Sequence, residues 1–563
     1  MPETPTLQLD NAAPSRLGAS SADSRSGPPP AARQIDVPAL LALLADGAEI
    51  ALIDVREEGE QARDGHIIHA VPLPLSRLEL RLGDLLPRQR VRVVVIDAGD
   101  GALADRAAAK LASLGFSAVS VLRGGVAAWR DAGQEVYTGD SAYSKTFGEF
   151  VEHTYATPHV SAPQLRQRLT DGDDLLLLDG RTLPEFEDFS IPGAHAVPNA
   201  ELPYRVHGLL KSPQTLVVIN CAGRTRSIIG AQTLINAGLP NPVVALENGT
   251  MDWLAEGFAL QHGERREAPP PAGEALEAAR AATRTLTRRF DLQWLDDAQL
   301  QAFRDARDTH TLYLYDVRSR AEFEAGHLPD ARWAEGGQLV QGVDKFVGVR
   351  NARVVVVDDE LGVRAAVTAS WLVQLGWAQV FAHATRPRGD GRVQGAQAAP
   401  AYPPLPAVET LTATELADAL RHGQAVVIDL ATSPAYEAGH IPGARFAVRA
   451  RLQAPQLRDL VGKGQTLVLT SPDGVLATFA APELAALASA PVRVLDGGTA
   501  AWKAARQPLE TGATALLHPA DDVWRSPYQA ADPLSAFREY LDWEINLLRQ
   551  FERDATVSFR VFA

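Results

Sequence analysis

The sequence predicts an α/β protein built from four consecutive domains, each a mainly parallel sheet flanked by helices. A block made of an apolar strand ending in Asp, a short helix and a turn occurs four times, with its aspartates at positions 54, 179, 316 and 429. Each block is followed by a second unbroken apolar run and a stretch with helical periodicity. Such runs are typical of strands buried on both faces of a parallel sheet. Regular alternation of strands and helices is typical of α/β domains.

The repeated elements can be followed along the chain in order. The first strand and turn of each copy read ALIDVREEGEQARDGHIIHA, LLLLDGRTLPEFEDFSIPGAHAVP, LYLYDVRSRAEFEAGHLPDA and AVVIDLATSPAYEAGHIPGA. The second apolar runs read RVVVID, TLVVIN, RVVVVD and TLVLTS. Three copies end with a further strand, a glycine turn and a helix that carries Trp129, Trp253 or Trp502, and the third copy lacks this piece. We expect these tryptophans to be packing anchors.

The repeat divides the chain into predicted parts, separated by segments rich in Pro, Gly and Ala. The first residues have the composition of a flexible leader, without the apolar segment of a signal peptide. In the last part Phe537, Tyr540, Leu541, Ile545 and Leu548 share one helical face, which we expect to dock within the chain or on a second copy in a homodimer. The predicted parts are a leader (1–34), a first domain (35–140), a second domain (141–265), a linker plus third domain (266–390), a linker plus fourth domain (391–515) and a helical tail (516–563).

Composition excludes several classes of function. The formal net charge of −15 argues against a nucleic-acid partner, which requires a basic face. No apolar run is long enough for a membrane span, so we expect a soluble, cytoplasmic protein. A single cysteine permits no intramolecular disulfide and no thiolate-rich zinc or iron–sulfur site. The histidines form no cluster at ligand spacing. We therefore expect neither a metal nor a cofactor.

The only cysteine, Cys221, stands in the segment CAGRTRS, between the strand TLVVIN and the helix SIIGAQTL. This places it at the carboxyl edge of a parallel sheet, where α/β proteins bind ligands. The loop amides at the helix start can hold an anion, and two arginines add positive charge. Such surroundings lower the pKa of a thiol from about 8.5, which favours a nucleophilic thiolate over a merely structural cysteine. The loop residues concerned are Ala222, Gly223, Arg224, Thr225, Arg226 and Ser227.

From about residue 35 to residue 511 the chain resembles the rhodanese family of sulfurtransferases, with four rhodanese-like domains in series. Two features carry the resemblance: the block D-x-R…E-F-x-x-G-H-[IL]-P-x-A and the loop C-A-G-R-T-R. The resemblance implies that Cys221 takes the outer sulfur of a donor such as thiosulfate and holds it as a persulfide. A thiol, cyanide or a sulfur-accepting protein then removes this sulfur. Arg181 could bind the donor with support from Asp179, or the two could form a structural ion pair.

The other three copies lack a cysteine and are expected to be inactive. Alignment by strand and helix ends places Cys221 opposite Ala98, opposite Asp359, and near Ser471 or Pro472. By analogy with tandem members of the family, we expect the first and second domains to form one unit, with Cys221 near their interface. The third and fourth domains would form another.

Other functions remain open at this stage. A cysteine phosphatase or arsenate reductase requires C-x5-R, but Ser227 stands where that pattern has its arginine. A persulfide carrier or scaffold with low turnover would also explain three inactive copies. A third alternative is 3-mercaptopyruvate as donor, which the resemblance associates with a less charged loop.

Overall fold

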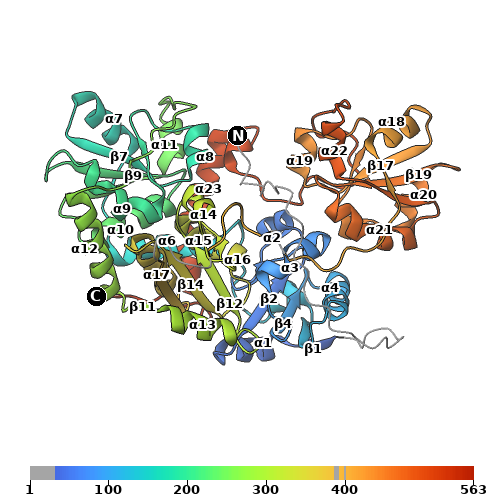
Figure 1. The fold of residues 1–563 in the computed structure, drawn as a ribbon, viewed down its shortest axis with the longest axis horizontal. Coiled ribbons are helices and arrows are strands. Elements are labelled where there is room, and N and C mark those ends of the chain that lie inside the picture. Colours follow the sequence, from blue (N-terminus) through green and yellow to red (C-terminus); the bar gives the residue numbers. More distant parts are fainter. Residues whose placement is uncertain (1–31, 386–391, 399–400, 563) are drawn as a thin grey trace.

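The computed structural model describes residues 32–385, 392–398 and 401–562, and it contains four five-stranded sheets (Figure 1). Every pair of neighbouring strands in these sheets is parallel, and the strand order is the same in all four. The predicted fold class is therefore confirmed. The predicted leader, residues 1–34, lies almost wholly outside the described residues, as does part of the linker before the fourth domain.

The first sheet has the strand order β1-β5-β4-β2-β3. All five residues of β2 are buried, as the unbroken apolar run predicts. The strands are β1 (Arg33–Ile35), β2 (Ile50–Asp54), β3 (Val71–Pro72), β4 (Arg92–Ile96) and β5 (Val119–Leu122). The helices are α1 (Val37–Ala45), α2 (Glu58–Asp64), α3 (Leu78–Leu85), α4 (Ala102–Ser113) and α5 (Gly125–Asp131).

The second sheet, with the order β6-β10-β9-β7-β8, carries the cysteine loop after β9. A long helix, α6 (Ala142–Tyr155), precedes it. Its strands are β6 (His159–Val160), β7 (Leu175–Asp179), β8 (His195–Ala196), β9 (Leu216–Asn220) and β10 (Val243–Leu246). Its helices are α7 (Ala162–Asp171), α8 (Leu183–Asp188), α9 (Leu202–Arg205), α10 (Thr225–Ala237) and α11 (Gly249–Ala255).

The third sheet follows α12 (Glu274–Arg289) and has the order β11-β15-β14-β12-β13. The predicted absence of a final strand in the third copy is wrong, because β15 completes this sheet. No described residue between β15 and the fourth sheet is helical, in agreement with the predicted absence of the tryptophan helix. The strands are β11 (Gln293–Trp294), β12 (Leu312–Asp316), β13 (Arg332–Trp333), β14 (Arg353–Asp358) and β15 (Val380–Ala384). The helices are α13 (Asp297–Asp305), α14 (Arg320–Ala325), α15 (Gly336–Gln341), α16 (Val343–Phe346) and α17 (Val363–Gln374).

The fourth sheet, ordered β16-β20-β19-β17-β18, is followed by the C-terminal helix α23 (Pro533–Phe551). The strands are β16 (Thr410–Leu411), β17 (Ala425–Asp429), β18 (Arg445–Phe446), β19 (Thr466–Thr470) and β20 (Val492–Leu495). The helices are α18 (Ala413–Arg421), α19 (Ser433–Ala438), α20 (Ala454–Leu460), α21 (Val475–Leu487) and α22 (Gly498–Ala504). None of the described helices has the length and apolar character that a membrane crossing requires.

The three repeated tryptophans are packing anchors, as expected. Trp129, Trp253 and Trp502 are almost fully buried. In each, the indole N–H donates to a backbone carbonyl six residues further on, so that the polar edge of the ring is satisfied. Each tryptophan therefore fixes its helix against the sheet of its own domain.

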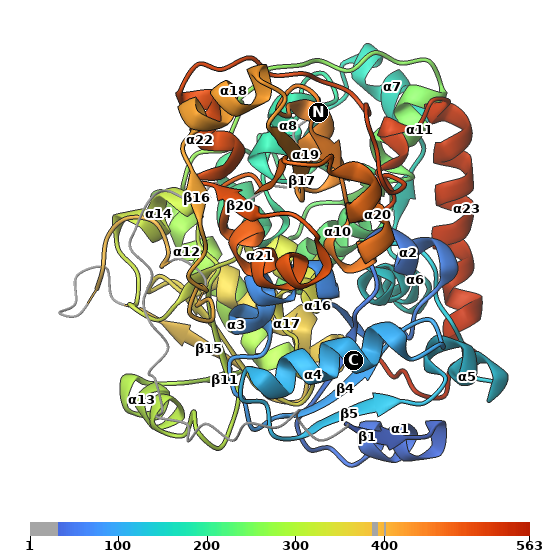
Figure 2. The ribbon, with the colours of Figure 1, turned by 90° about the vertical axis from the view of Figure 1, so that its right-hand side faces the viewer.

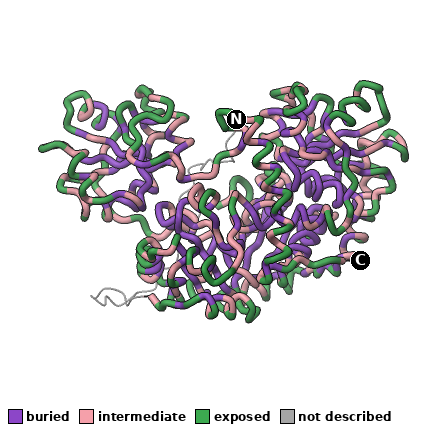
Figure 3. Tube along the Cα trace, turned by 180° about the vertical axis from the view of Figure 1, so that it is seen from behind, coloured by how far each residue is buried: buried purple, intermediate pink, exposed green. Residues whose placement is uncertain are grey.

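The domains are not paired in chain order. In space their order is second, third, first and fourth. Figure 1 shows the second and fourth domains on opposite sides, and in Figure 2 the fourth domain faces the viewer. The first domain contacts the third through a bridge between Ile50 and Arg350. It contacts the fourth through the buried ion pair of Glu79 with Arg449, at 2.9 Å. In Figure 3 buried residues run through the lower part of the molecule, and the fourth domain lies to one side of it.

The main partner of the second domain is the third, so the expected pairing of the first domain with the second is wrong. The reason lies in two equivalent helices, α10 and α17, which are buried around nearly their whole circumference. Each packs one face on its own sheet and the other in the domain interface. There the Trp371 indole donates to the Thr233 hydroxyl at 2.8 Å.

One buried arginine holds this interface together electrostatically. Arg364 of α17 is fully buried and lies within 3.2 Å of carboxylate oxygens of four residues. One of them, Glu201, belongs to the second domain. The four carboxylates are those of Glu201, Glu322, Asp358 and Asp359.

Replacing this arginine should destabilise the protein strongly. Arg364→Met keeps most of the volume but leaves buried carboxylates without their cation, which typically costs about 3–5 kcal/mol. We expect the melting temperature to fall by roughly 5–10 °C in calorimetry. The matched control is Arg320→Met, because Arg320 forms an exposed pair with Glu324 and should shift the melting temperature by at most a degree or two. Equal shifts for the two variants would contradict this assignment.

Candidate functional site

Cys221 directly follows β9, at the carboxyl edge of the second sheet, and the loop ends where α10 begins at Thr225. Backbone hydrogen bonds fix the loop against the start of α11. The Cys221 carbonyl accepts from the Thr250 amide at 2.9 Å, and the Ala222 carbonyl accepts from the Met251 amide at 3.0 Å. Gly249 makes this approach possible, because its φ is +55° and a Cβ there would lie 2.3 Å from the Cys221 oxygen.

The Cys221 thiol is only 2% exposed, and burial raises its pKa. The charge of Arg226 and hydrogen bonds from Ser227 oppose this rise without cancelling it. The predicted lowering of the thiol pKa is therefore wrong for the covered loop seen here. The loop does supply the expected stabilising groups, but removal from water outweighs them.

The two loop arginines are engaged by carboxylates. Arg224 binds both oxygens of Glu149 at 2.7 and 2.9 Å and also contacts Glu152, both from α6. Burial, only partly offset by Arg224, raises the pKa of Glu149 to about 7. Arg226 forms a two-pronged pair with Glu185 of α8, with both distances 2.8 Å. Burial acts against ionisation of Glu185 as well, but Arg226 prevails and the pKa is lowered to about 2.

Arg181 and Asp179 form a buried pair behind the loop. The Arg181 guanidinium donates to both Asp179 oxygens, at 2.8 to 3.1 Å, and to the Phe189 carbonyl. Asn220, the last residue of β9, donates to the same carboxylate at 2.9 Å. Two of the three domains without a cysteine contain the same pair, Arg56 with Asp54 and Arg318 with Asp316. These contacts match the structural alternative for Arg181.

Strand pairing corrects the predicted equivalents of Cys221. In the second sheet Asn220 pairs with Asp179. In the other sheets the residues that pair with the corresponding aspartates are Ile96, Val357 and Thr470. The next residue in each chain segment is therefore the true equivalent of Cys221. These residues are Asp97, Asp358 and Ser471, so the predicted Ala98 and Asp359 are each wrong by one position.

In these three domains the corresponding side chain caps its own helix. Asp97 accepts from the Ala104 amide at 3.1 Å, Asp358 from the Ala365 amide at 3.0 Å, and Ser471 from the Ala477 amide at 3.3 Å. A side-chain oxygen thus occupies the place beside the helix amides that sulfur occupies in the second domain.

The C-terminal segment covers the cysteine loop, and Figure 1 shows α23 beside the second domain. The Tyr528 hydroxyl donates to the Ala222 carbonyl at 3.2 Å. The Thr225 amide and hydroxyl donate to the Glu544 carboxylate, at 3.3 and 2.5 Å. Tyr540 and Glu544 also lie over Gly223, 3.4 and 3.5 Å from the position of a Cβ at that residue.

Sequence reasoning predicted that the tail docks but not what it contributes. The apolar face contains Phe537 and Leu541 as predicted, but Ile545 is 45% exposed. Glu544 takes its place on the buried face. The sequence could have indicated this role, because the Glu544 carboxylate falls on the same helical face as Leu541 and Leu547. The glutamates that engage the loop arginines gave no such signal, because they come from other helices.

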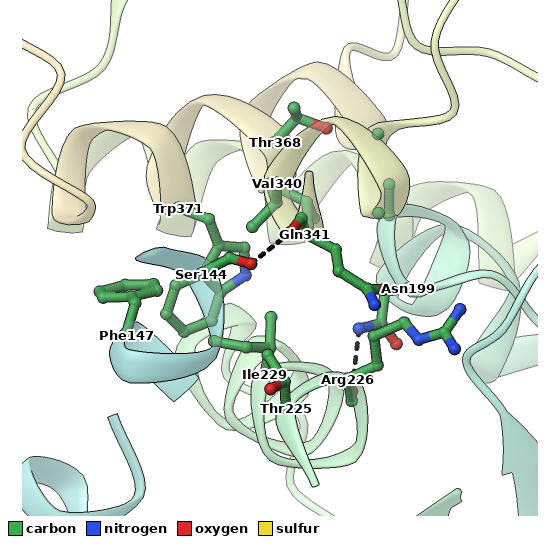
Figure 4. Close-up of a pocket in the computed structure, with 14 residues that line it drawn as sticks. Ser144, Phe147, Asn199, Thr225, Arg226, Ile229, Val340, Gln341, Thr368 and Trp371 are labelled. Carbon is green, nitrogen blue, oxygen red and sulfur yellow. Dashed lines mark hydrogen bonds between the residues drawn. The ribbon is translucent and has the colours of Figure 1, made fainter. Parts of the chain in front are cut away.

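A narrow cavity lies behind the loop, between the second and third domains (Figure 4). Its free volume of about 20 Å³ has room for one water molecule. The Asn199 amide donates to the Arg226 carbonyl at 2.8 Å, and Ser144 donates to the Gln341 carbonyl. The small volume shows that the interface around the cavity is well packed, and this interface supports α10 from behind. Among the described residues, no group of three or more His, Cys, Asp or Glu side chains is placed to hold a metal ion.

Comparison with known proteins agrees with this architecture. The family model "Rhodanese-like domain" matches residues 36–132, 161–256, 297–384 and 412–505. The crystal structure of a thiosulfate sulfurtransferase from Pseudomonas aeruginosa is 43% identical, with a TM-score of 0.90 over 94% of this chain and 100% of that one. A sulfurtransferase of Allochromatium vinosum is 36% identical over 96 residues, which are 17% of this chain and 86% of that protein. The chain belongs to the rhodanese-like family, and its four sheets are four tandem rhodanese-like domains.

Proposed function

We propose that this protein transfers sulfane sulfur and that Cys221 carries the sulfur. One observation supports this above all: the only cysteine of the chain lies at the carboxyl edge of a parallel sheet, beside the N-terminus of α10. In the three other domains an Asp or Ser oxygen takes this position, and oxygen cannot carry sulfane sulfur. The second domain is therefore the catalytic one in this proposal.

In the first half-reaction the Cys221 thiolate attacks the outer sulfur of the donor. With thiosulfate, a bond forms between the Cys221 sulfur and the outer sulfur, and the S–S bond of the donor breaks. Sulfite leaves with the electron pair of that bond. The cysteine persulfide anion that remains is stabilised by amides at the start of α10 and by the charge of Arg226.

In the second half-reaction an external acceptor removes the sulfur. A thiolate or cyanide attacks the outer persulfide sulfur, and the Cys221 thiolate is released as the leaving group. No second cysteine is present to resolve the persulfide within the chain. The likeness to the Pseudomonas aeruginosa enzyme supports thiosulfate as a donor.

The proposal predicts one covalently bound sulfur atom per chain. The reduced protein is incubated with thiosulfate, separated from the donor and examined by intact mass spectrometry. We expect a gain of one sulfur atom, lost on addition of cyanide, and no gain for Cys221→Ser. Turnover with saturating acceptor then distinguishes an enzyme from a slow carrier. The proposal is wrong if the unmodified protein gains no sulfur from any sulfane donor.

The raised pKa of Cys221 predicts how its reactivity depends on pH. A raised pKa means that the thiol form prevails near neutral pH and that the reactive thiolate accumulates as pH rises. The rate of alkylation by iodoacetamide should therefore increase continuously from pH 6 to 9, with an apparent pKa above that of an unperturbed thiol. Because Cys221 is the only thiol, the Cys221→Ser variant gives the background directly. A rate that is already constant from pH 6 upward would show instead that the loop lowers the pKa.

A further inference from the structure

The C-terminal helix brings a negative charge into the cysteine loop. Glu544 is only 1% exposed, and one of its carboxylate oxygens accepts from both the amide and the hydroxyl of Thr225. Thr225 is the first residue of α10, where the helix dipole favours an anion. Glu544 therefore occupies part of the environment that the loop offers to an anionic sulfur donor.

The second oxygen of Glu544 is buried and has no hydrogen-bond partner in the described structure. It lies 3.5 Å from the position of a Cβ at Gly223. A buried carboxylate oxygen without a donor is costly, and proteins satisfy such groups unless function requires otherwise. This oxygen is thus directed toward the loop and is free to interact with whatever enters there.

Among the described residues no cation forms a direct ion pair with Glu544, although the charges of Arg224 and Lys145 act on it from a greater distance. Arg224 is held by Glu149 and Glu152, and Arg226 is held by Glu185. Lys145 lies 5.1 Å from the ring centres of Tyr540 and Trp543 and donates to the Asp140 carbonyl. The loop is therefore less positive than the sequence CAGRTRS alone indicates, and Glu544 contributes to the raised pKa of Cys221.

We propose that Glu544 determines how much negative charge a sulfur donor can carry. Its carboxylate on Thr225 favours donors with one negative charge over dianions such as thiosulfate. This inference rests on the proposed sulfur transfer through Cys221. A thiosulfonate, R–SO2–S⁻, is a monoanion with the same reacting group. The Cys221 thiolate takes its outer sulfur, the S–S bond breaks, and a sulfinate leaves with the electron pair, as sulfite does from thiosulfate.

The test compares thiosulfate with methanethiosulfonate in the full-length protein. Glu544→Gln keeps the size and the oxygen that accepts from Thr225 but removes the charge. We expect kcat/KM for thiosulfate to rise about tenfold, because the second negative charge of this dianion then no longer lies a few ångströms from a carboxylate. The value for methanethiosulfonate should rise less than about threefold. Glu539→Gln, the same change on the exposed side of α23, should alter neither value.

A second variant keeps the test informative if Glu544→Gln folds poorly. Glu544→Met replaces the carboxylate with an apolar chain of similar volume and should shift the ratio of the two kcat/KM values in the same direction. Equal changes with both donors, or no change with either, would overturn the role of Glu544 and leave sulfur transfer intact. Failure of all variants and of the unmodified protein to take sulfur from either donor would overturn the proposed function, and this inference with it.

Discussion

The hydrogen bond between the residue after the central strand and an amide at the start of the next helix organises each domain. It closes the turn from strand to helix and satisfies an amide that has no partner within its helix. Asp97, Asp358 and Ser471 make this bond through oxygen. In the second domain the thiol of Cys221 lies at the same place, beside Ser227. Only there does the repeated scaffold place a nucleophile capable of carrying sulfur.

The surroundings of Cys221 come from distant parts of the chain. The helix α6 holds Arg224, α8 holds Arg226, the third domain supports α10 from behind, and α23 covers the loop from the front. Each contact limits the movement of the loop and excludes water from it. Exclusion of water raises the pKa of the thiol, but it also strengthens the electrostatic interactions that act on any charge formed there. The third domain, which has no cysteine, thus contributes to the site through packing.

Local patterns predicted much of the fold. The unbroken apolar runs identified the central strands, such as β2 and β9, and the segment between TLVVIN and SIIGAQTL placed Cys221 correctly at a strand end. The alignment of the other copies failed by one residue because loop length varies. The capping amide lies seven residues after Asp97 and Asp358, but six after Ser471. A sequence alignment by loop ends cannot detect this difference, whereas strand register does.

Contacts between distant segments could not be predicted in the same way. Arg224 and Arg226 suggested a strongly positive loop, but their charge is offset by Glu149, Glu152 and Glu185, which come from segments far away in sequence. The pairing of the second and third domains depends on α10 and α17 together, since each buries a second face against the other domain. The corresponding helix of the first domain, α4, carries Asp105, Arg106 and Lys110. Comparing these helices would have indicated the partner.

The central claim is that the scaffold builds one sulfur-carrying position, at Cys221. The most direct measurement is a crystal structure of the protein after treatment with thiosulfate, with anomalous scattering used to locate sulfur atoms. The account predicts one additional sulfur peak, bonded to the Cys221 sulfur and close to the amides at the start of α10. An unmodified Cys221 in crystals of protein that turns over thiosulfate would contradict it, because the sulfur would then be transferred without this cysteine.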